Sequence, residues 1–514
     1  MFKRSRALAS VALIAVTAGL AAPAWAETLQ EAIALAYRTN PTLQGQRAQQ
    51  RALDEAVPQA RAGLRPTVSV SGSARYTRTD LPNSPGVDLN GDGLFTGAFD
   101  SPPSNNVTES DSIGASIGVE QTLYSGGRIA RGIDAAEASV LSGRESLRSI
   151  EQQVLGAVIQ AYVDVQRDVE ILRIREANLS VLRRQLDESN ARFEVGEITR
   201  TDVSQSEARL AQSEADLAGA QAQLSVSRAS YAAVIGQAPT NLEEPPALPG
   251  VPTDFDAALD IGLAENPNLL AAEYQLREAE ARHAQARSAH LPSVGLSGSY
   301  GGSAPVDGFD LSDRTNTFQA GVSLSVPLFT GGLNSSRVAQ ALEQANAAKI
   351  EIDRQKRSVL QGVSSAYAQV VSNRSQLEAG VAGVSAARVA AEGVRQEQQV
   401  GLRTTLDVLN GELELRNAEI NLAVAKRNLY VAQASLLTSM GRLSGEDLNP
   451  AIEIYDPAVN AQRARLRGAV PWDGLVETLD RIAAPPITPA NETENAPIDT
   501  QLDGEIVRTA PNSN

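Results

Sequence analysis

The chain has 514 residues, a formal net charge of −16 and no cysteine. The acidic balance argues against a nucleic-acid partner, because binding phosphates needs a basic surface. Without cysteine, the sequence offers no disulfide, no thiolate metal site and no lipid anchor on a cysteine thiol.

Residues 1–26 have the pattern of a secretory signal peptide. Basic residues precede an apolar run over residues 7–22, and a small-x-small cleavage site ends at Ala26. We expect the mature chain to begin at Glu27 and to act outside the cytoplasm. No other apolar run in the sequence reaches the roughly 20 residues of a membrane-spanning helix, so insertion into a membrane would require strands.

The mature sequence is a duplicated unit, with one copy over residues 27–250 and the other over residues 251–444. Helices are predicted at the start of each copy, over residues 27–64 and 254–290. An Asn-Pro dipeptide interrupts both helical regions at equivalent positions, because proline disfavours the α conformation in the residue before it. The same order of elements then follows in each copy.

A long helical hairpin is predicted in each copy, over residues 128–236 and 333–441. In the first copy, apolar residues recur every seven positions along the outgoing helix, at Val158, Val165, Leu172, Leu179, Leu186 and Phe193. This spacing is typical of a coiled-coil seam. A helix of about 65 residues would be about 100 Å long, which is far longer than a globular core.

Strands are predicted between the helices and the hairpin of each copy, where apolar residues alternate with Ser, Gly and Gln. The four strands are expected over residues 66–78, 111–125, 292–302 and 316–329. Such strands suit either a half-buried sheet in a soluble protein or an outer-membrane barrel with a wet lumen. The signal peptide, the strand length and the polar faces favour the barrel.

Tyr124 and Phe329 occupy equivalent strand ends, where an aromatic belt would meet the membrane surface. Four strands do not close a barrel, since the smallest membrane barrels have eight and open sheet edges are not tolerated in lipid. A membrane-inserted chain would therefore have to oligomerise.

The loop between the first two strands contains Asp88, Asn90 and Asp92, spaced like the start of a calcium loop. Its twelfth position holds Phe99 instead of glutamate, so a solvated surface loop is the favoured interpretation. We predict no resident metal, no cofactor and no enzymatic activity, since the sequence has no phosphate-binding glycine loop, serine nucleophile elbow or zinc-type histidine motif.

The repeated order of elements resembles the TolC family of outer-membrane efflux proteins. Each copy has two strands, a Leu-aromatic-Ser/Thr-Gly-Gly motif (residues 123–127 and 328–332) and a long hairpin, and the match covers residues 27 to about 445. The resemblance implies a mainly α fold with a transmembrane β section. Three copies would form a twelve-stranded outer-membrane barrel, four strands from each, continuous with a periplasmic α-barrel of coiled-coil hairpins.

The same resemblance implies the function of an exit duct in a tripartite efflux pump or a type I secretion system. Its partners would be two further copies of the chain, the outer-membrane lipid, a periplasmic adaptor and an inner-membrane pump of the RND or ABC class. The duct would be a passive conduit that opens when its partners move the hairpin tips.

The resemblance also assigns roles to residues at the hairpin tips. Asp407 and Asn410 match positions that line the periplasmic constriction, whereas Thr201, Asp202 and Arg403 match positions that tether neighbouring hairpins in the closed state. The positions that match the adaptor-docking tips are Val195, Gly196, Val400, Gly401 and Leu402.

Two residues depart from the family pattern. Asn410 replaces a usual aspartate and Gln398 replaces a usual tyrosine, so we expect weaker cation selectivity and a looser gate. From the residues alone, a threonine three positions before Asp202 and before Asp407 predicts a capping box at the start of each returning helix. The structural and functional interpretations of these tips are compatible.

Residues 445–514 contain many Pro, Asn, Thr and acidic residues and are predicted to be largely disordered, apart from a short piece around residues 472–479. The main alternative function is a soluble periplasmic coiled-coil adaptor, whose β segments would form a small soluble domain. A diffusion porin is disfavoured, because it has no need of the long helices.

Overall fold

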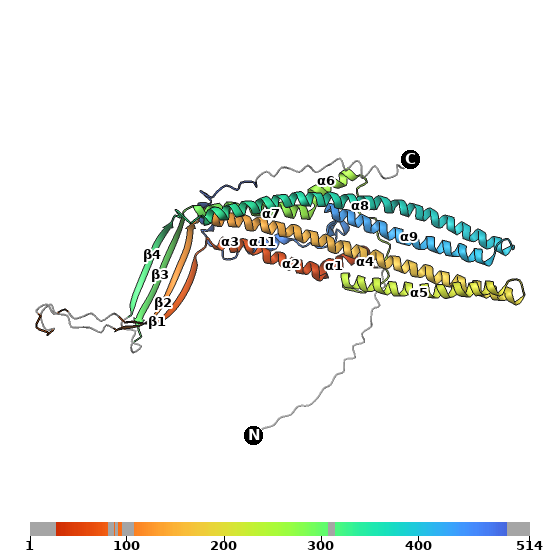
Figure 1. The fold of residues 1–514 in the computed structure, drawn as a ribbon, viewed down its shortest axis with the longest axis horizontal. Coiled ribbons are helices and arrows are strands. Elements are labelled where there is room, and N and C mark those ends of the chain that lie inside the picture. Colours follow the sequence, from red (N-terminus) through yellow and green to blue (C-terminus); the bar gives the residue numbers. More distant parts are fainter. Residues whose placement is uncertain (1–26, 81–86, 88–90, 95–106, 307–313, 491–514) are drawn as a thin grey trace, which may run out of the picture.

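The structure is a computed structural model that describes residues 27–80, 87, 91–94, 107–306 and 314–490. The molecule is elongated, with a sheet at one end, two helical hairpins at the other and shorter helices packed between them (Figure 1). The predicted signal peptide lies outside the described residues.

Each copy begins with short helices that an Asn-Pro dipeptide separates. Asn40 and Asn266 each cap the following helix, and their Nδ2 atoms donate to the carbonyls of Val234 and Ser439 near the ends of the two hairpins. The dipeptide therefore fixes where each copy folds back on its own hairpin. The helices are α1 (Leu29–Thr39), α2 (Pro41–Asp54), α3 (Ala56–Ala62), α6 (Phe255–Glu265), α7 (Pro267–Arg287) and the 3-10 turn η1 (Ser288–His290).

The two hairpins have identical helix lengths. Their outgoing helices have 67 residues each and their returning helices 36 residues each. They are α4 (Arg128–Glu194) with α5 (Arg200–Ile235), and α8 (Leu333–Gln399) with α9 (Thr405–Met440). Among the described residues, no helix is both long enough and apolar enough to cross a membrane.

The main apolar core lies midway along the molecule, where α1 and α6 pack against the long helices (Figure 1). Val158, Tyr162 and Val363 are fully buried there. The coiled-coil positions of the first copy and of the second copy therefore meet in one shared core.

A single antiparallel sheet has the strand order β1-β2-β3-β4. The strand β4 ends four residues before its predicted end, because Pro327 has no N–H with which to continue the ladder. The strands are β1 (Thr67–Asp80), β2 (Val107–Tyr124), β3 (Ser293–Pro305) and β4 (Thr315–Ser325).

The C-terminal region contradicts the prediction of extensive disorder. It contains α10 (Gly445–Leu448), α11 (Pro457–Arg465) and α12 (Asp473–Arg481). Composition was misleading here because Pro457 occupies the first turn of a helix, where proline is favoured, and because Val476 and Asp480 are buried against distant parts of the chain. Residues 491–514 lie outside the described residues.

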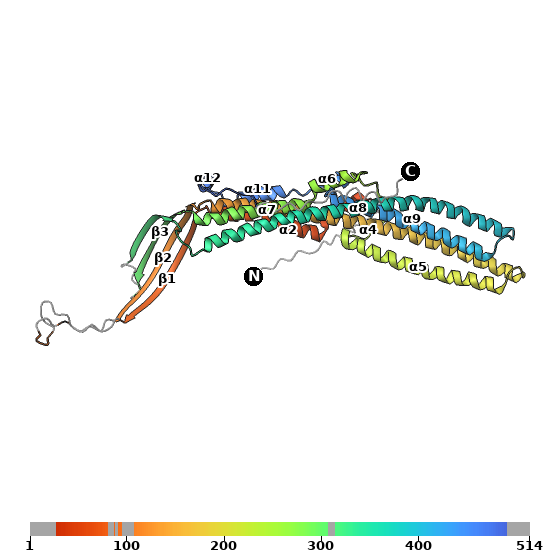
Figure 2. The same cartoon turned by 45° about the horizontal axis from the view of Figure 1, so that its top comes forward.

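Residues 456–490, here called the C-terminal strap, cross the helical layer beside the sheet. The helix α11 packs on α2 and α3, α12 packs on β2 and α4, and residues 483–486 reach α7 and α8. Figure 2 shows α11 and α12 along one side of the helices, with α12 at the junction with the sheet.

Candidate functional site: an apolar sheet face and two hairpin tips

The sheet has one continuous apolar face. Its register places Val70, Ile117, Tyr300 and Phe318 in a single row across the four strands. All four side chains are exposed in the single chain. An exposed apolar surface that spans a whole sheet marks contact with a membrane or with another protein.

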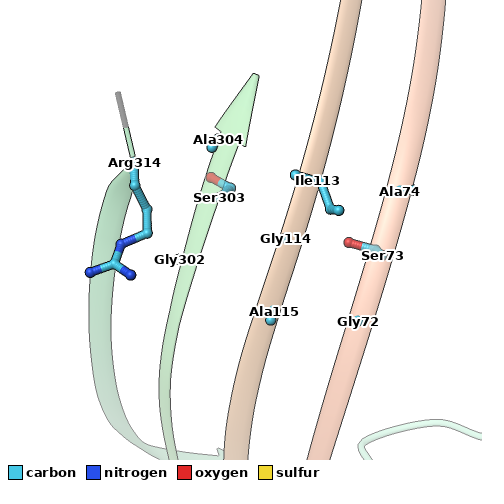
Figure 3. Close-up of a pocket in the computed structure, with 10 residues that line it drawn as sticks. All are labelled: Gly72, Ser73, Ala74, Ile113, Gly114, Ala115, Gly302, Ser303, Ala304 and Arg314. Atoms are coloured by element: carbon cyan, nitrogen blue, oxygen red, sulfur yellow. The ribbon is translucent and has the colours of Figure 1, made fainter. Parts of the chain in front are cut away.

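Charged residues bound this apolar face at the end away from the helices. Arg78 Nη1 donates to Glu109 Oε1 at 3.0 Å across β1 and β2. Figure 3 shows Arg314 extending beside Gly302, at the rim of a shallow pocket that crosses β1, β2 and β3. The apolar band therefore has a polar boundary at its far end, as a membrane-spanning sheet requires.

The opposite face of the sheet is polar and made of small residues. Ser71 and Ser116 face each other with their Oγ atoms 2.8 Å apart, and glycines such as Gly114 and Gly118 lie in the same alternation. Small polar side chains suit contact with water. The two faces of the sheet thus match lipid on one side and a wet lumen on the other.

Both edges of the sheet are open within the described residues. The strand β1 pairs only with β2, and β4 pairs only with β3. Unpaired edge groups are costly in lipid, where no water can satisfy them. A single chain therefore provides only a segment of a closed barrel.

The two predicted belt aromatics lie at the helical end of the sheet. Tyr124 is the last residue of β2 and is partly buried. Phe329 follows the end of β4 and is 89% exposed. The aromatic belt and its contact with lipid remain a prediction.

The tip of the first hairpin is a glycine turn followed by a capped helix. Gly196 has a φ of 77°, which a residue with a side chain rarely adopts, and its N–H donates to the Phe193 carbonyl. Asp202 Oδ2 accepts from the Thr199 N–H at 2.9 Å and from Thr199 Oγ1 at 2.8 Å. The predicted capping box is present, while Thr201 is exposed beside it.

The second tip repeats this geometry. Gly401 has a φ of 80°, and Asp407 Oδ2 accepts from the Thr404 N–H at 3.0 Å and from Thr404 Oγ1 at 2.8 Å. Arg403 Nε donates to Glu397 Oε2 at 2.7 Å within the same hairpin. Arg403 is therefore occupied locally in the single chain.

These capping contacts affect the ionisation of both tip carboxylates. Hydrogen bonds from the Thr199 hydroxyl and amide lower the pKa of Asp202, and hydrogen bonds from the Thr404 amide and hydroxyl lower the pKa of Asp407. The ion pair with Glu397 raises the pKa of Arg403. All three groups therefore carry their charges at neutral pH.

Comparison with known proteins agrees with this geometry. A family model described as outer membrane efflux protein matches residues 32–237 and 258–442, which are the two copies of the unit. The chain belongs to the outer membrane efflux protein family. The resemblance to TolC-like channels is thereby confirmed, and so is the expected location in the outer membrane.

Individual relatives cover most of the chain. It is 33% identical to the outer membrane efflux protein BepC of Brucella suis, over 92% of this chain and 98% of that protein. It is 28% identical to the outer membrane protein TolC of Vibrio cholerae, over 76% of this chain and 85% of that protein. The solved structure of the outer membrane protein VceC of Vibrio cholerae has the same fold, with a TM-score of 0.64 at 21% identity, over 80% of this chain and 96% of that one.

Side-chain hydrogen bonds between long helices help to join the hairpins of this efflux protein. Near the tips, Arg209 Nη2 of α5 donates to Asn410 Oδ1 of α9 at 3.1 Å. Farther from the tips, Arg427 Nε of α9 donates to Asp164 Oδ1 of α4 at 2.7 Å. No sequence signal predicted Arg209, Asp164 and Arg427, because nothing local indicates which charged residues of two long helices will face each other.

The predicted docking residues form the outermost surface of the tips. Val195, Val400 and Leu402 are exposed, and a side chain at Gly196 or Gly401 would meet no atom within 4 Å. Apolar side chains at the end of a long coiled coil make no contribution to its core. They leave a surface available to a partner.

The weak calcium candidate is not supported by the described residues. Asp88 and Asn90 lie outside them, and Asp92 Oδ1 accepts from the Leu94 N–H at 2.7 Å, as in an ordinary turn. In the part of the chain that the structure describes, no three His, Cys, Asp or Glu residues gather as metal ligands would.

Proposed function

We propose that this outer membrane efflux protein is a passive exit duct for efflux or type I secretion, built as a homotrimer. Three copies would close a twelve-stranded barrel in the outer membrane, and their hairpins would extend it through the periplasm. The protein would act as a conduit and perform no catalytic step. Any energy would come from an inner-membrane RND or ABC pump, reached through a periplasmic adaptor.

The amphipathic four-stranded sheet with two open edges is the observation that carries this proposal. Its apolar face suits lipid, its polar face suits a lumen, and its edges require further strands. The 67-residue helices α4 and α8 leave the same end of the sheet, and each is about 100 Å long at 1.5 Å per residue. A porin or a compact soluble protein has no need of such helices.

The tips are proposed as the gate and as the adaptor-docking surface. Threefold symmetry would place three Asp407 carboxylates around one axis, where they would attract cations. Asn410 would face the Arg209 side chain of the same protomer, so it would add no second acidic ring. Thr201, Asp202 and Arg403 would hold neighbouring hairpins together until a partner with higher affinity for the open state shifts the population.

Planar-bilayer conductance of the purified trimer tests the gate. We expect a multivalent cation added on the periplasmic side to block the wild-type duct and to block an Asp407→Ala duct much less. Glu197→Ala is the control, because it removes an exposed carboxylate from the tip of the other hairpin without touching a residue assigned to the gate. Unchanged block in the Asp407→Ala duct would refute the assignment of Asp407 to the constriction.

Membrane fractionation tests the wider proposal against the soluble-adaptor alternative. We expect the mature chain in outer-membrane fractions, as a trimer that only detergent releases. Release of a monomer without detergent would instead support the adaptor and would remove the apolar sheet face from contact with lipid.

A further inference from the structure

We propose that α12 of the C-terminal strap lies in the inner-leaflet interface of the outer membrane and holds the junction of sheet and helices to the lipid surface. This inference rests on the proposed function, since it requires the sheet to span that membrane. It concerns a surface outside both the barrel strands and the hairpin tips.

The first observation is a row of exposed large apolar side chains on one flank of α12. Trp472, Leu475, Leu479 and Ile482 are between 44% and 74% exposed. At about 100° per residue, these four side chains fall within roughly 80° of one another around the helix axis. A continuous apolar row on a short surface helix, unlike a single exposed leucine, indicates a binding surface.

The buried side of α12 fixes the helix in place. Val476 packs with Leu64, Ile129 and Ile133. Asp480 is fully buried and accepts hydrogen bonds from the backbone of the β2–α4 junction. The orientation of the apolar row is therefore set by the core of the junction and is not a property of a loose tail.

Polar contacts then show which way the apolar row faces. Glu477 lies 4.0 Å from Arg61 of α3, and Arg481 lies 3.0 Å from Asp134 of α4, so these two side chains face the helical body. On a helical wheel the apolar row lies roughly opposite to Glu477 and Arg481. It faces the end of the molecule that carries the apolar sheet.

The contacts of the strap place α12 at the level where the sheet meets the helices. The strap contacts α3 through α11, β2 and α4 through α12, and α7 and α8 through residues 483–486. Figure 2 shows α12 at this junction, which is the level of the membrane surface if the sheet spans the membrane. A tryptophan at its start fits this level, where aromatic side chains of membrane proteins concentrate.

A cationic side chain lies beside the strap after α12. Arg287 lines a groove of ≈ 760 Å³ together with His290 and residues 483–486 of the strap, just before β3 begins. Within the described residues Arg287 forms no ion pair with a carboxylate. A phosphate group of a phospholipid at this position would complement the charge of Arg287.

Lipid is favoured over a second copy of the chain as the occupant of this surface. Copies would meet at the open edges β1 and β4, whereas α12 packs on β2 and α4, which lie inside the protomer. Large apolar side chains are also a poor lining for a water-filled duct. The outer, lipid-facing side of the barrel lies away from the edges between copies and away from the water-filled duct.

The mature chain contains its own probe for this contact. Of the two tryptophans, Trp25 lies in the predicted signal peptide, so Trp472 is the only one left after cleavage. The experiment uses the full mature protein, checked by mass, in liposomes of phosphatidylethanolamine and phosphatidylglycerol. Trp472 emission is recorded with lipids brominated near the headgroup and, separately, with iodide in the buffer.

We expect blue-shifted Trp472 emission that the brominated lipid quenches and iodide does not. Leu475→Ser combined with Leu479→Ser should reduce the quenching by lipid, whereas Val459→Ser, an exposed site on α11, should leave it unchanged. Emission quenched by iodide alone would overturn the proposal. Emission shielded from both quenchers would also overturn it, because another protein copy would then cover the helix.

Failure of the proposed function would give a different result. Protein that does not float with the liposomes would contradict the outer-membrane duct itself. Protein that floats, and whose Trp472 nevertheless responds to iodide, would contradict only the interfacial position of α12.

Discussion

The two strand-to-helix junctions of this protein have the same sequence motif and the same backbone, yet their surroundings differ. Gly127 before α4 has a φ of 80°, and Gly332 before α8 has a φ of 86°. At the first junction, a side chain on Gly127 would lie 2.2 Å from Ala484 of the strap. At the second, a side chain on Gly332 would meet no atom within 4 Å.

The start of α4 is also capped from outside its own copy. Asp480 accepts from the N–H groups of Ser125 at 2.5 Å, Gly127 at 3.3 Å and Ala130 at 3.1 Å. A buried helix N-terminus needs such an acceptor, because its first N–H groups have no partner inside the helix. The start of α8 lies at the protomer edge, where the described residues supply no equivalent carboxylate.

This difference shows that the two copies of the unit share their local structure although the surroundings of their junctions differ. The motif specifies the turn in both copies, and the strap covers the interior junction alone. Stability at the first junction therefore depends on residues that have no counterpart in the duplicated unit.

Removing the strap carboxylate should have the largest effect, because it makes the first junction resemble the second. Asp480→Ala would leave three N–H groups near the start of α4 without their acceptor. We expect a loss of about 2–4 kcal/mol in the stability of this region. Thermal unfolding in detergent and limited proteolysis of the strap measure it.

Glu453→Ala provides the control for this change, since Glu453 is an exposed carboxylate in the same C-terminal region. The control should unfold like the wild type. Equal protease resistance of the strap in Asp480→Ala and wild type would contradict the capping role of Asp480.

Replacing each of the two junction glycines by alanine should have an intermediate effect on stability and should show how the junctions differ. Gly332→Ala should cost about 1–2 kcal/mol, because alanine must adopt a positive φ. Gly127→Ala should cost that amount and also displace Ala484, so protease should cut the strap faster in this variant alone. Equal effects of the two substitutions on the strap would show that it does not press on the first junction.

Two equivalent tyrosines in the middle of the hairpins also have different surroundings, and substitutions there should have a smaller effect on stability. Tyr162 OH lies 2.8 Å from the Glu27 carbonyl and 2.6 Å from the Glu243 carbonyl, and burial raises the pKa of Tyr162. Its counterpart Tyr367 donates to the Thr253 carbonyl at 2.8 Å in a more exposed place.

Tyr162→Phe should therefore destabilise the protein by about 1–2 kcal/mol, because it removes the hydrogen bonding of a buried hydroxyl to these carbonyls, whereas Tyr367→Phe should cost under about 1 kcal/mol. Midpoints of thermal unfolding in the same detergent compare the two variants. A larger loss for Tyr367→Phe would mean that the second copy depends more on this position than its exposure indicates.

Local periodicity explains how much of the fold was predictable. The heptads of α4 and the alternation in β1 to β4 indicate which side of each element is apolar. The sheet register then places the apolar sides of the four strands on one face. Among the site residues, the capping boxes at Asp202 and Asp407 were predictable because their partners lie three residues away. The Arg209–Asn410 contact was not, since its partners are 201 residues apart.

By itself the sequence determined the duplicated unit, the hairpins, the amphipathic strands and the glycine tips, because each depends on contacts between residues close along the chain. Only the tertiary structure decided which junction is covered and where the C-terminal region lies. Asp480 and Ser125 are 355 residues apart and share no motif. Their contact exists because the packing of Val476 on the α3–α4 core brings the strap carboxylate to the start of α4.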